Sequence, residues 1–186
     1  MPSVDRDLAP VVVRATVAEV PVVQRLMQLY LYDLATLLHT FVPEPAWPWD
    51  VNDDGTYGDP ARVASFWTDP ARGAFLVRVD GRLAGFALVR RGSQFVGGEA
   101  WEMSEFFVLG RFRRKGVGRR AAWRLFDEHP GPWEVAEMDY NRPAQAFWRR
   151  TIGAYTGERY QESRARLHGM DFVVQRFAAP GAAPCP

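Results

Sequence analysis

The sequence lacks the features that mark secreted, metal-binding or membrane-spanning proteins. It contains one cysteine, Cys185, which can neither close an internal disulfide nor build a zinc site, so we expect no metal. No apolar run approaches the length of about 18 residues that a transmembrane helix needs. The N-terminus also lacks the apolar core of a signal peptide. These absences predict a cytoplasmic protein that does not bind membranes.

The positive charge is distributed unevenly along the chain. The net charge of +1 argues against a general nucleic-acid binder. No Lys or Arg occurs between His39 and Pro60, a segment that holds five acidic residues, whereas seven of the 23 Lys and Arg residues lie between Arg111 and Arg124. The acidic and the basic segments are therefore separate in sequence, and each needs its own explanation.

The pattern of apolar residues predicts one α/β domain at residues 1–177, followed by a disordered tail at 178–186. An Asp-Gly turn at residues 80–81 predicts a hairpin, and we expect another short strand near Gly157–Gln161. The sheet should be antiparallel through the hairpin and parallel across the strand–helix–strand unit near Trp101–Asp139. The other elements expected are strands near 10–17, 100–110, 132–139 and 170–177, and helices from about 17 into the thirties and near 61–69, 118–129 and 142–152.

The stretch "RFRRKGVGRR" (111–120) joins the end of a predicted strand to the start of a predicted helix. The N-terminus of a helix carries unpaired N–H groups and partial positive charge, so an anion is stabilised there. Gly116 and Gly118 remove Cβ atoms where a ligand would touch the backbone. The pattern therefore favours a phosphate-binding loop over a solvated basic patch.

Two other phosphate motifs fit less well. A Walker loop requires Gly-Lys-Ser/Thr, whereas Lys115 precedes Gly116. "GVGRRA" (116–121) matches the dinucleotide fingerprint, with Glu137 or Asp139 at a suitable distance. However, "LGRFRRK" separates these glycines from the strand, and the elements that follow cannot complete a doubly wound sheet. A nucleic-acid binder that uses the basic loop is a further, weaker alternative, because it needs more basic residues on the same face.

Two segments carry a family resemblance. "FFVLGRFRRKGVGRRAAWRLF" resembles the acetyl-CoA-binding motif of the GNAT N-acetyltransferase superfamily, whose R/Q-x-x-G-x-G/A pattern fits 113–118. "NRPAQAFWRRTIGAY" resembles the downstream segment of this family, with Asn141, Ala144, Phe147 and Gly153 in place. The resemblance covers about 11–177. It implies a GNAT-like α/β fold with a central, mostly antiparallel sheet, a splayed parallel strand pair and flanking helices.

The resemblance also implies acetyl-CoA (coenzyme A) as cofactor. Backbone N–H groups of the loop would hold the pyrophosphate, and the strand near Phe106–Val108 would pair with the pantetheine arm. An N–H near Val108 would stabilise the oxyanion, while Arg119, Arg120, Arg149 or Arg150 would meet the 3′-phosphate. The cofactor-binding residues expected are Phe106, Phe107, Val108, Arg113, Arg114, Lys115, Gly116, Val117, Gly118, Arg119, Asn141, Phe147 and Trp148.

For the chemistry, the resemblance implies an N-acetyltransferase in which a primary amine attacks the thioester directly in a ternary complex. Glu105 and Glu102 are the candidate bases, and strand alternation puts them on opposite faces unless a bulge intervenes. We favour Glu105, because the apolar residues of "SEFFV" would raise its pKa. The tyrosine general acid of the family falls at Trp148, so Tyr155 or Tyr140 would serve instead, or the thiolate leaves unaided.

The acidic, aromatic segment "PEPAWPWDVNDD" suggests where the acceptor binds. Trp47 and Trp49 would contact a cationic amine, with Tyr30 and Asp33 facing the same cleft. The same segment also fits a solvated loop whose tryptophans close the core. The acceptor would be an amine-bearing small molecule or a peptide, without nucleic acid, and a homodimer is compatible with the sequence. A non-catalytic acyl-CoA-binding module is the alternative function, because the tyrosine is missing.

Overall fold

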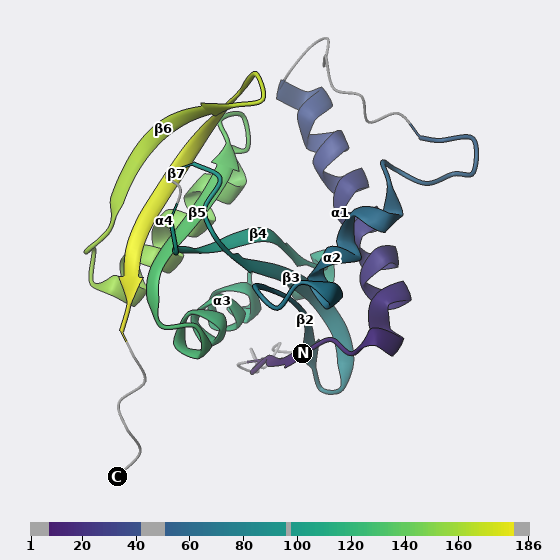
Figure 1. Cartoon of the computed structure of the whole chain (residues 1–186), viewed down its shortest axis with the longest axis horizontal. Helices are drawn as coiled ribbons and strands as arrows, with labels where there is room; N and C mark the ends of the chain where they lie inside the picture. Colours follow the sequence, from purple (N-terminus) through teal and green to yellow (C-terminus); the bar gives the residue numbers. More distant parts are fainter. Residues whose placement is uncertain (1–7, 42–50, 96–97, 181–186) are drawn as a thin grey trace, which may run out of the picture.

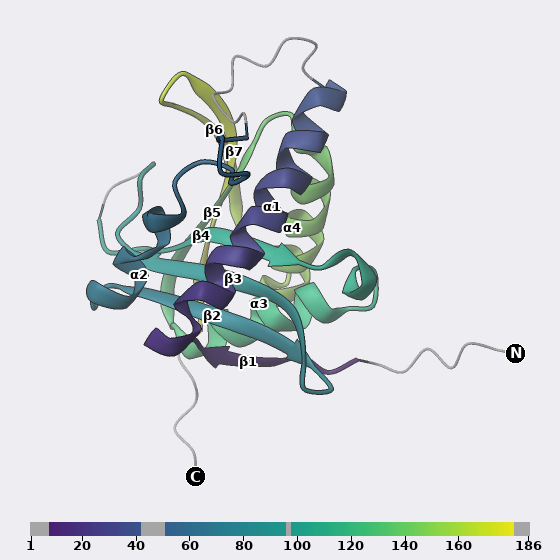
Figure 2. The same cartoon turned by 90° about the vertical axis from the view of Figure 1, so that its right-hand side faces the viewer.

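The computed structural model describes residues 8–41, 51–95 and 98–180 and has a seven-stranded mixed sheet with helices on both faces (Figures 1 and 2). The strand order is β1-β2-β3-β4-β5-β7-β6, and β4–β5 is the one parallel pair in it. This mixed α/β arrangement confirms the expected fold class. The elements are β1 (Val11–Arg14), α1 (Val20–Phe41), α2 (Ser65–Thr68), β2 (Arg72–Val79), β3 (Arg82–Arg91), β4 (Trp101–Val108), α3 (Val117–Glu128), β5 (Gly131–Met138), α4 (Arg142–Thr156), β6 (Gln161–Leu167) and β7 (Met170–Ala179).

The first helix begins with a capping box formed by Thr16 and Glu19. The Thr16 backbone N–H donates to the Glu19 carboxylate at 3.0 Å. The helix starts as a 3₁₀ turn at Val17–Glu19, and α1 then runs to Phe41. None of the described helices is both long and apolar enough to cross a lipid bilayer.

The two faces of the sheet bury different cores, because successive strand residues point to opposite sides. Leu76, Phe86 and Leu88 pack with α1. Their neighbours Phe75 and Ala87 pack with α3 and α4 on the other face. Figure 2 shows α1 lying across the sheet on one side, with α3 and α4 behind it. Because helices pack on both faces of the sheet, the position of each helix terminus relative to the strand ends is set by this packing.

Two expectations near the C-terminus differ from the structure. The additional strand expected near Gly157–Gln161 is present but lies later in the chain, because Gly157 and Glu158 have left-handed backbone (φ +62° and +61°) where α4 ends. The strand β6 begins only at Gln161. Its sequence "QESRARL" has no apolar alternation, since it is an exposed edge strand. The tail expected to begin at residue 178 begins later, because Ala178 and Ala179 belong to β7 and pair with β5. Residues 181–186 lie outside the described residues.

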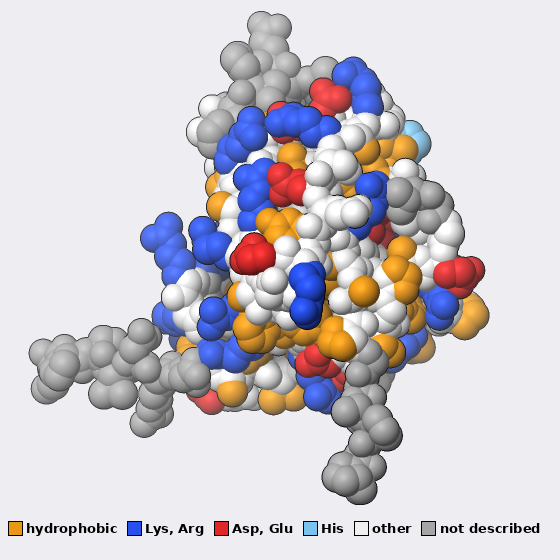
Figure 3. All heavy atoms as spheres, turned by 90° about the vertical axis from the view of Figure 1, so that its left-hand side faces the viewer, with side chains coloured by type: hydrophobic (Ala, Val, Ile, Leu, Met, Phe, Trp, Pro, Cys, Tyr) orange, Lys and Arg blue, Asp and Glu red, His pale blue; other side chains and the backbone are white. Residues whose placement is uncertain are grey.

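The β6 edge carries interspersed charge. Figure 3 views the molecule from the side on which β6 lies and shows cationic and acidic side chains next to each other. The ion pairs include Arg149–Glu162 at 2.7 Å and Arg164–Asp139 at 2.7 Å. Charged side chains on an edge strand oppose pairing with other chains.

One carboxyl is buried beneath α4. Glu137 is 5% exposed and lies on the same face of β5 as Trp133 and Val135, which belong to the core packed under α4. Burial raises the pKa of Glu137 to about 8, although the Gln175 side chain opposes the shift. At neutral pH the Glu137 carboxyl therefore keeps its proton in the folded protein and loses it when the chain unfolds.

This buried proton predicts a specific pH dependence of stability. Between the ordinary glutamate pKa of about 4.3 and the folded value, the folded state holds the extra proton, so the free energy of unfolding falls by up to about 1.4 kcal/mol per pH unit as pH rises. Glu137→Gln should remove this decline, as urea unfolding between pH 5 and 9 would measure. Glu99→Gln, whose side chain is 81% exposed, is the control and should keep it. Equal pH profiles for wild type and Glu137→Gln would contradict the buried proton.

Candidate functional site

The parallel strands β4 and β5 separate soon after they start. They are in register only at Trp101↔Trp133 and Glu102↔Glu134. Farther along, β4 remains paired with β3 and β5 with β7, so the two strands diverge while each keeps an antiparallel partner (Figure 1). Beyond those two pairs the facing edges of β4 and β5 are not paired with each other, and we call this break in the pairing the opening.

The β4 edge presents N–H groups to this opening. The N–H of Leu109 donates to Ala84 of β3 at 2.8 Å. Successive N–H groups of a strand point to opposite edges. The N–H groups of Val108 and Phe106 therefore point away from β3, toward the opening, where they can donate to a bound molecule.

At the end of β4 the chain enters α3 through a turn suited to an anion. Gly116 precedes the helix with φ +73°, and Arg114 also has left-handed backbone, with φ +61°. The first intrahelical bond runs from the Arg120 N–H to the Gly116 carbonyl at 3.1 Å. The amides of 116–119 precede that bond, as expected at a helix N-terminus. Arg114 and Lys115 are exposed beside them.

Three other cations of this loop have partners within the protein. Arg113 donates to the Val108 carbonyl at 2.7 Å and to the Asp33 carboxylate of α1 at 2.6 Å. Arg120 donates to the Leu8 carbonyl at 2.9 Å, and Arg119 lies over the Trp123 ring. Asp33, which we expected in the acceptor cleft, therefore fastens the loop to α1.

Aromatic rings pack beneath the opening. Phe106 stacks on Phe147 with ring centroids 5.9 Å apart, and it contacts the buried Trp148 at 5.1 Å. A Cβ on Gly118 would lie 3.2 Å from the Phe147 ring and 3.5 Å from Val108. Close packing thus requires Gly118 to be small, a reason that the sequence motif did not reveal.

Asn141 and Val117 occupy positions at the starts of the two helices. The Asn141 side chain accepts from the Ala144 N–H at 3.1 Å and caps α4. Val117 is fully buried at the start of α3. Both residues position the helices that adjoin the opening, and neither side chain presents a charge to it.

A β-bulge brings the two candidate bases to the same face. Leu88 is opposite Glu105 while Val89 is opposite Met103, so Ser104 is the extra residue in β4. Glu105 and Glu102 therefore both face the α1 side of the sheet. Strand alternation predicts opposite faces unless a bulge intervenes, and the structure has that bulge.

Glu102 is committed to structural contacts. It is 3% exposed and accepts from Arg90 at 2.8 Å. It also accepts from the Gln94 backbone at 3.0 Å and from the Gln94 side chain at 3.2 Å. These donors occupy the lone pairs of the carboxylate, so Glu102 is held in structural contacts.

Glu105 has the environment of a base. Its side chain is 17% exposed and lies 3.3 Å from the Arg62 guanidinium. Burial raises the pKa of Glu105, while Arg62 and a hydrogen bond from Tyr30 oppose the shift. Burial and the Glu105 carboxylate together raise the pKa of Tyr30 well above its ordinary value, so this phenol stays protonated as a donor. Both groups lie between α1 and β4.

The two tyrosines considered as general acids lie in different places. Tyr140 follows β5, where burial raises its pKa to about 12, and it interacts electrostatically with Tyr30. Tyr155 donates to Asp127 at 2.7 Å, near the C-terminal ends of α3 and α4, and its pKa is also raised by burial. The structure therefore brings Tyr140, and not Tyr155, toward the other candidates. Trp47 and Trp49 lie outside the described residues.

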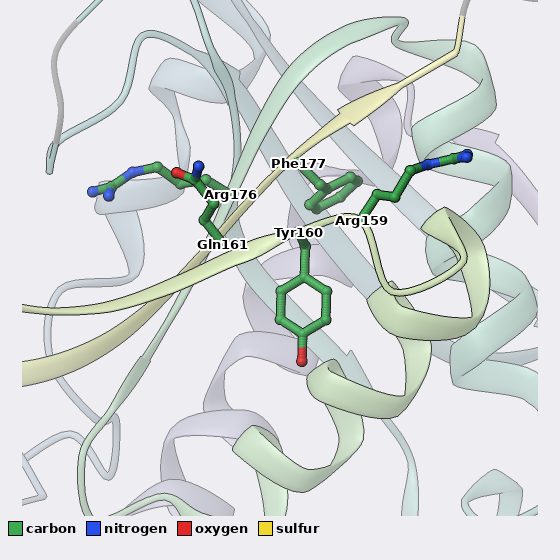
Figure 4. Close-up of a pocket in the computed structure, with 5 residues that line it drawn as sticks. All are labelled: Arg159, Tyr160, Gln161, Arg176 and Phe177. Atoms are coloured by element: carbon green, nitrogen blue, oxygen red, sulfur yellow. The ribbon is translucent and has the colours of Figure 1, made fainter.

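A hollow of about 490 Å³ lies away from the opening, at the start of β6. Tyr160 and Phe177 line it, and the side chains of Arg159 and Arg176 point in opposite directions (Figure 4). Because its polar groups diverge, this hollow has no arrangement suited to catalysis.

Comparisons with known proteins agree with this geometry. The model of the family described as "Acetyltransferase (GNAT) family" matches residues 31–154. A GNAT-family acetyltransferase from Streptococcus agalactiae 2603 has a similar structure, with a TM-score of 0.68 and 15% identity over 91% of this chain and 95% of that one. No curated protein sequence matches this chain.

Two further structures show the same fold. The ribosomal-protein-S18-alanine N-acetyltransferase of Escherichia coli has a TM-score of 0.58 and 16% identity over 94% of this chain and 97% of its own. The Salmonella typhimurium protein yncA, with its cofactor acetyl-CoA, has a TM-score of 0.59 and 16% identity over 95% and 98%.

The position of Val108 depends on the absence of a side chain at Gly85, which lies opposite it in β3. A Cβ on Gly85 would overlap the Phe107 carbonyl oxygen. Gly85→Ala should lower the free energy of unfolding by about 1–3 kcal/mol, as overpacking does. Gly110→Ala, which meets no atom within 4 Å, should change it by less than about 0.5 kcal/mol. Urea unfolding measures both, and equal stabilities would contradict the close approach of β3 to β4.

Proposed function

Because the family model matches two thirds of its length, the chain belongs to the acetyltransferase (GNAT) family, and we propose that it transfers an acetyl group from acetyl-CoA to a primary amine. The observation that carries the proposal is the opening between β4 and β5, with the N-terminus of α3 at its end. An opening of this kind would suit a long, thin molecule with an anionic end.

Each part of the donor has a counterpart in the chain. The amides of 116–119 would hold the pyrophosphate, with Arg114 and Lys115 adding positive charge. The N–H of Phe106 would bind the pantetheine arm. When bound, acetyl-CoA supplies an acyl carbon activated as a thioester, which exchanges its bond to sulfur for a bond to the amine nitrogen. The N–H of Val108 would stabilise the negative charge that develops on the carbonyl oxygen.

Glu105 would serve as the base. An alkylamine with a pKa of about 10.4 is mostly protonated at pH 7 and must lose a proton before it can attack. Glu105 can take that proton directly or through water, while Tyr30 holds the carboxylate in place. Tyr140 is protonated at neutral pH and can donate to the departing sulfur, and a thiolate with a pKa of about 8.5 is also a tolerable leaving group.

A non-catalytic acyl-CoA-binding module remains the second candidate. The observation that favours it is Trp148, which is 5% exposed and stands where the family has a tyrosine. Such a module would bind coenzyme A but release no thiol with any amine.

Replacement of the base should change both the rate and its pH dependence. Glu105→Gln should lower kcat/KM for the amine by about 100-fold or more at pH 7. The wild-type rate should fall as pH drops through the pKa of Glu105, which lies above the usual value, and the variant should lack this limb. Thiol release on a Cys185→Ser background would measure both without a thiol from the protein.

The control for this experiment is Glu99→Gln, which removes an exposed carboxylate and should leave kcat/KM unchanged. Calorimetry should show that Glu105→Gln binds coenzyme A as tightly as the wild type. An unchanged rate in Glu105→Gln would refute the assignment of the base. Absence of turnover in the wild type with every amine tested would favour the binding module.

The loop cations should contribute to coenzyme A affinity. Lys115→Gln removes an exposed charge beside the helix amides, and the dissociation constant should rise by about tenfold, the size of one charge-assisted contact. The difference should shrink in 1 M salt because screening weakens exposed charges. Titration calorimetry measures the dissociation constants. The control is Arg91→Gln, which removes a cation at the C-terminal end of β3, away from the loop. Equal affinities at low salt would place the phosphates elsewhere.

A further inference from the structure

The cation beside the candidate base is the starting point. Arg62 lies in the 3₁₀ turn Pro60–Val63, which Asp59 caps by accepting from the Ala61 N–H at 2.8 Å. Val63 in the same turn is buried in the core under α1 and is 1% exposed. The backbone of Arg62 is thus fixed at both ends of the turn, so its side chain has a defined origin beside Glu105.

Arg62 reaches both the buried carboxylate and the solvent. Its Nη2 is 3.3 Å from Glu105 Oε1, and its side chain is 46% exposed whereas that of Glu105 is 17% exposed. A guanidinium has five N–H donors in a planar fork. A single contact of this length leaves donors available to a ligand that enters from the solvent side.

The charges at this position constrain the acceptor. Arg62 and Glu105 together are neutral. An acceptor with an ammonium group alone would add a positive charge next to the guanidinium in a partly buried position, which is unfavourable. An acceptor with both an ammonium and a carboxylate adds none, because Glu105 can face the ammonium while Arg62 faces the carboxylate.

Three neighbouring carboxylates do not offset an extra positive charge, because each of the three faces an arginine. The pairs are Glu102–Arg90 at 2.8 Å, Asp33–Arg113 at 2.6 Å and Asp139–Arg164 at 2.7 Å. Each of these three ion pairs is therefore charge-balanced. They do not favour the purely cationic acceptor that the acidic segment at 43–54 suggests, and residues 43–50 of that segment lie outside the described residues.

We propose that the acceptor is a free α-amino acid whose carboxylate binds Arg62 while its amine faces Glu105. The inference rests on the proposed function and narrows its substrate class. A peptide N-terminus does not fit, because its first carboxyl group is part of an amide bond. In a free α-amino acid a single carbon separates the amine from the carboxylate. This short separation matches Glu105 and Arg62, which contact each other directly.

Matched pairs of acceptors test this inference. Phenylalanine and phenethylamine, and tryptophan and tryptamine, differ only in the carboxylate. Wild-type kcat/KM should be at least about tenfold higher for the amino acid of each pair, the effect of one charge-assisted contact. Arg62→Gln should remove this preference by raising the KM of the amino acid, while kcat/KM of the decarboxylated partner stays within about threefold. Arg62→Lys should retain part of the preference, because a point charge replaces a planar fork.

The control is Arg124→Gln, which removes another exposed arginine from an ion pair with Glu128 and should leave the preference intact. A wild-type enzyme that prefers the decarboxylated amines or a peptide N-terminus would overturn the inference and leave the proposed function standing. An equal loss for both members of a pair in Arg62→Gln would also overturn it, because Arg62 would then act only through Glu105. Absence of thiol release with every acceptor would overturn the proposed function and the inference together.

Discussion

The short pairing of β4 with β5 is the constraint on which the proposed site depends. Two registered residue pairs hold the strands together at one end, and antiparallel partners hold each strand beyond that point. A continuous pairing would consume the edge donors of β4 and close the sheet. Beyond those pairs, β3 occupies the other edge of β4 and β7 the other edge of β5. The opening between them leads to the N-terminus of α3.

The electrostatics of the site follow from one extra residue. The bulge at Ser104 places Glu102 and Glu105 on one face, where two carboxylates would repel each other if both lacked partners. Glu102 has its charge satisfied by Arg90 and Gln94. Glu105 is left with a longer contact to Arg62 and with partial burial. In the proposed mechanism the two side chains would have different roles, structural for Glu102 and chemical for Glu105, because their surroundings differ while their residue type is the same.

Most of the fold, and the position of the basic loop at 111–120, could be predicted from the sequence because both depend on local patterns. Apolar periodicity and the Asp-Gly turn predicted the hairpin and the helices, and two motifs predicted the family. Long-range contacts were invisible to such reasoning. The bulge depends on the register between two strands, and the Arg113–Asp33 pair joins residues 80 positions apart. Strand β6 was misplaced because an edge strand exposed to water needs no apolar alternation. The location of Tyr155 likewise depends on how α4 packs against α3.

Helix α1 contributes to both halves of the proposed site. Tyr30 contacts Glu105 on the acceptor side, and Asp33, one turn farther along, fastens Arg113 of the donor loop. Neighbouring turns of a helix move together, so a displacement of one contact is transmitted to the other. Any free energy by which occupancy of one half changes the affinity of the other must be equal in both directions. The order in which the two molecules arrive can therefore alter the kinetics, but it cannot alter the stability of the complete assembly.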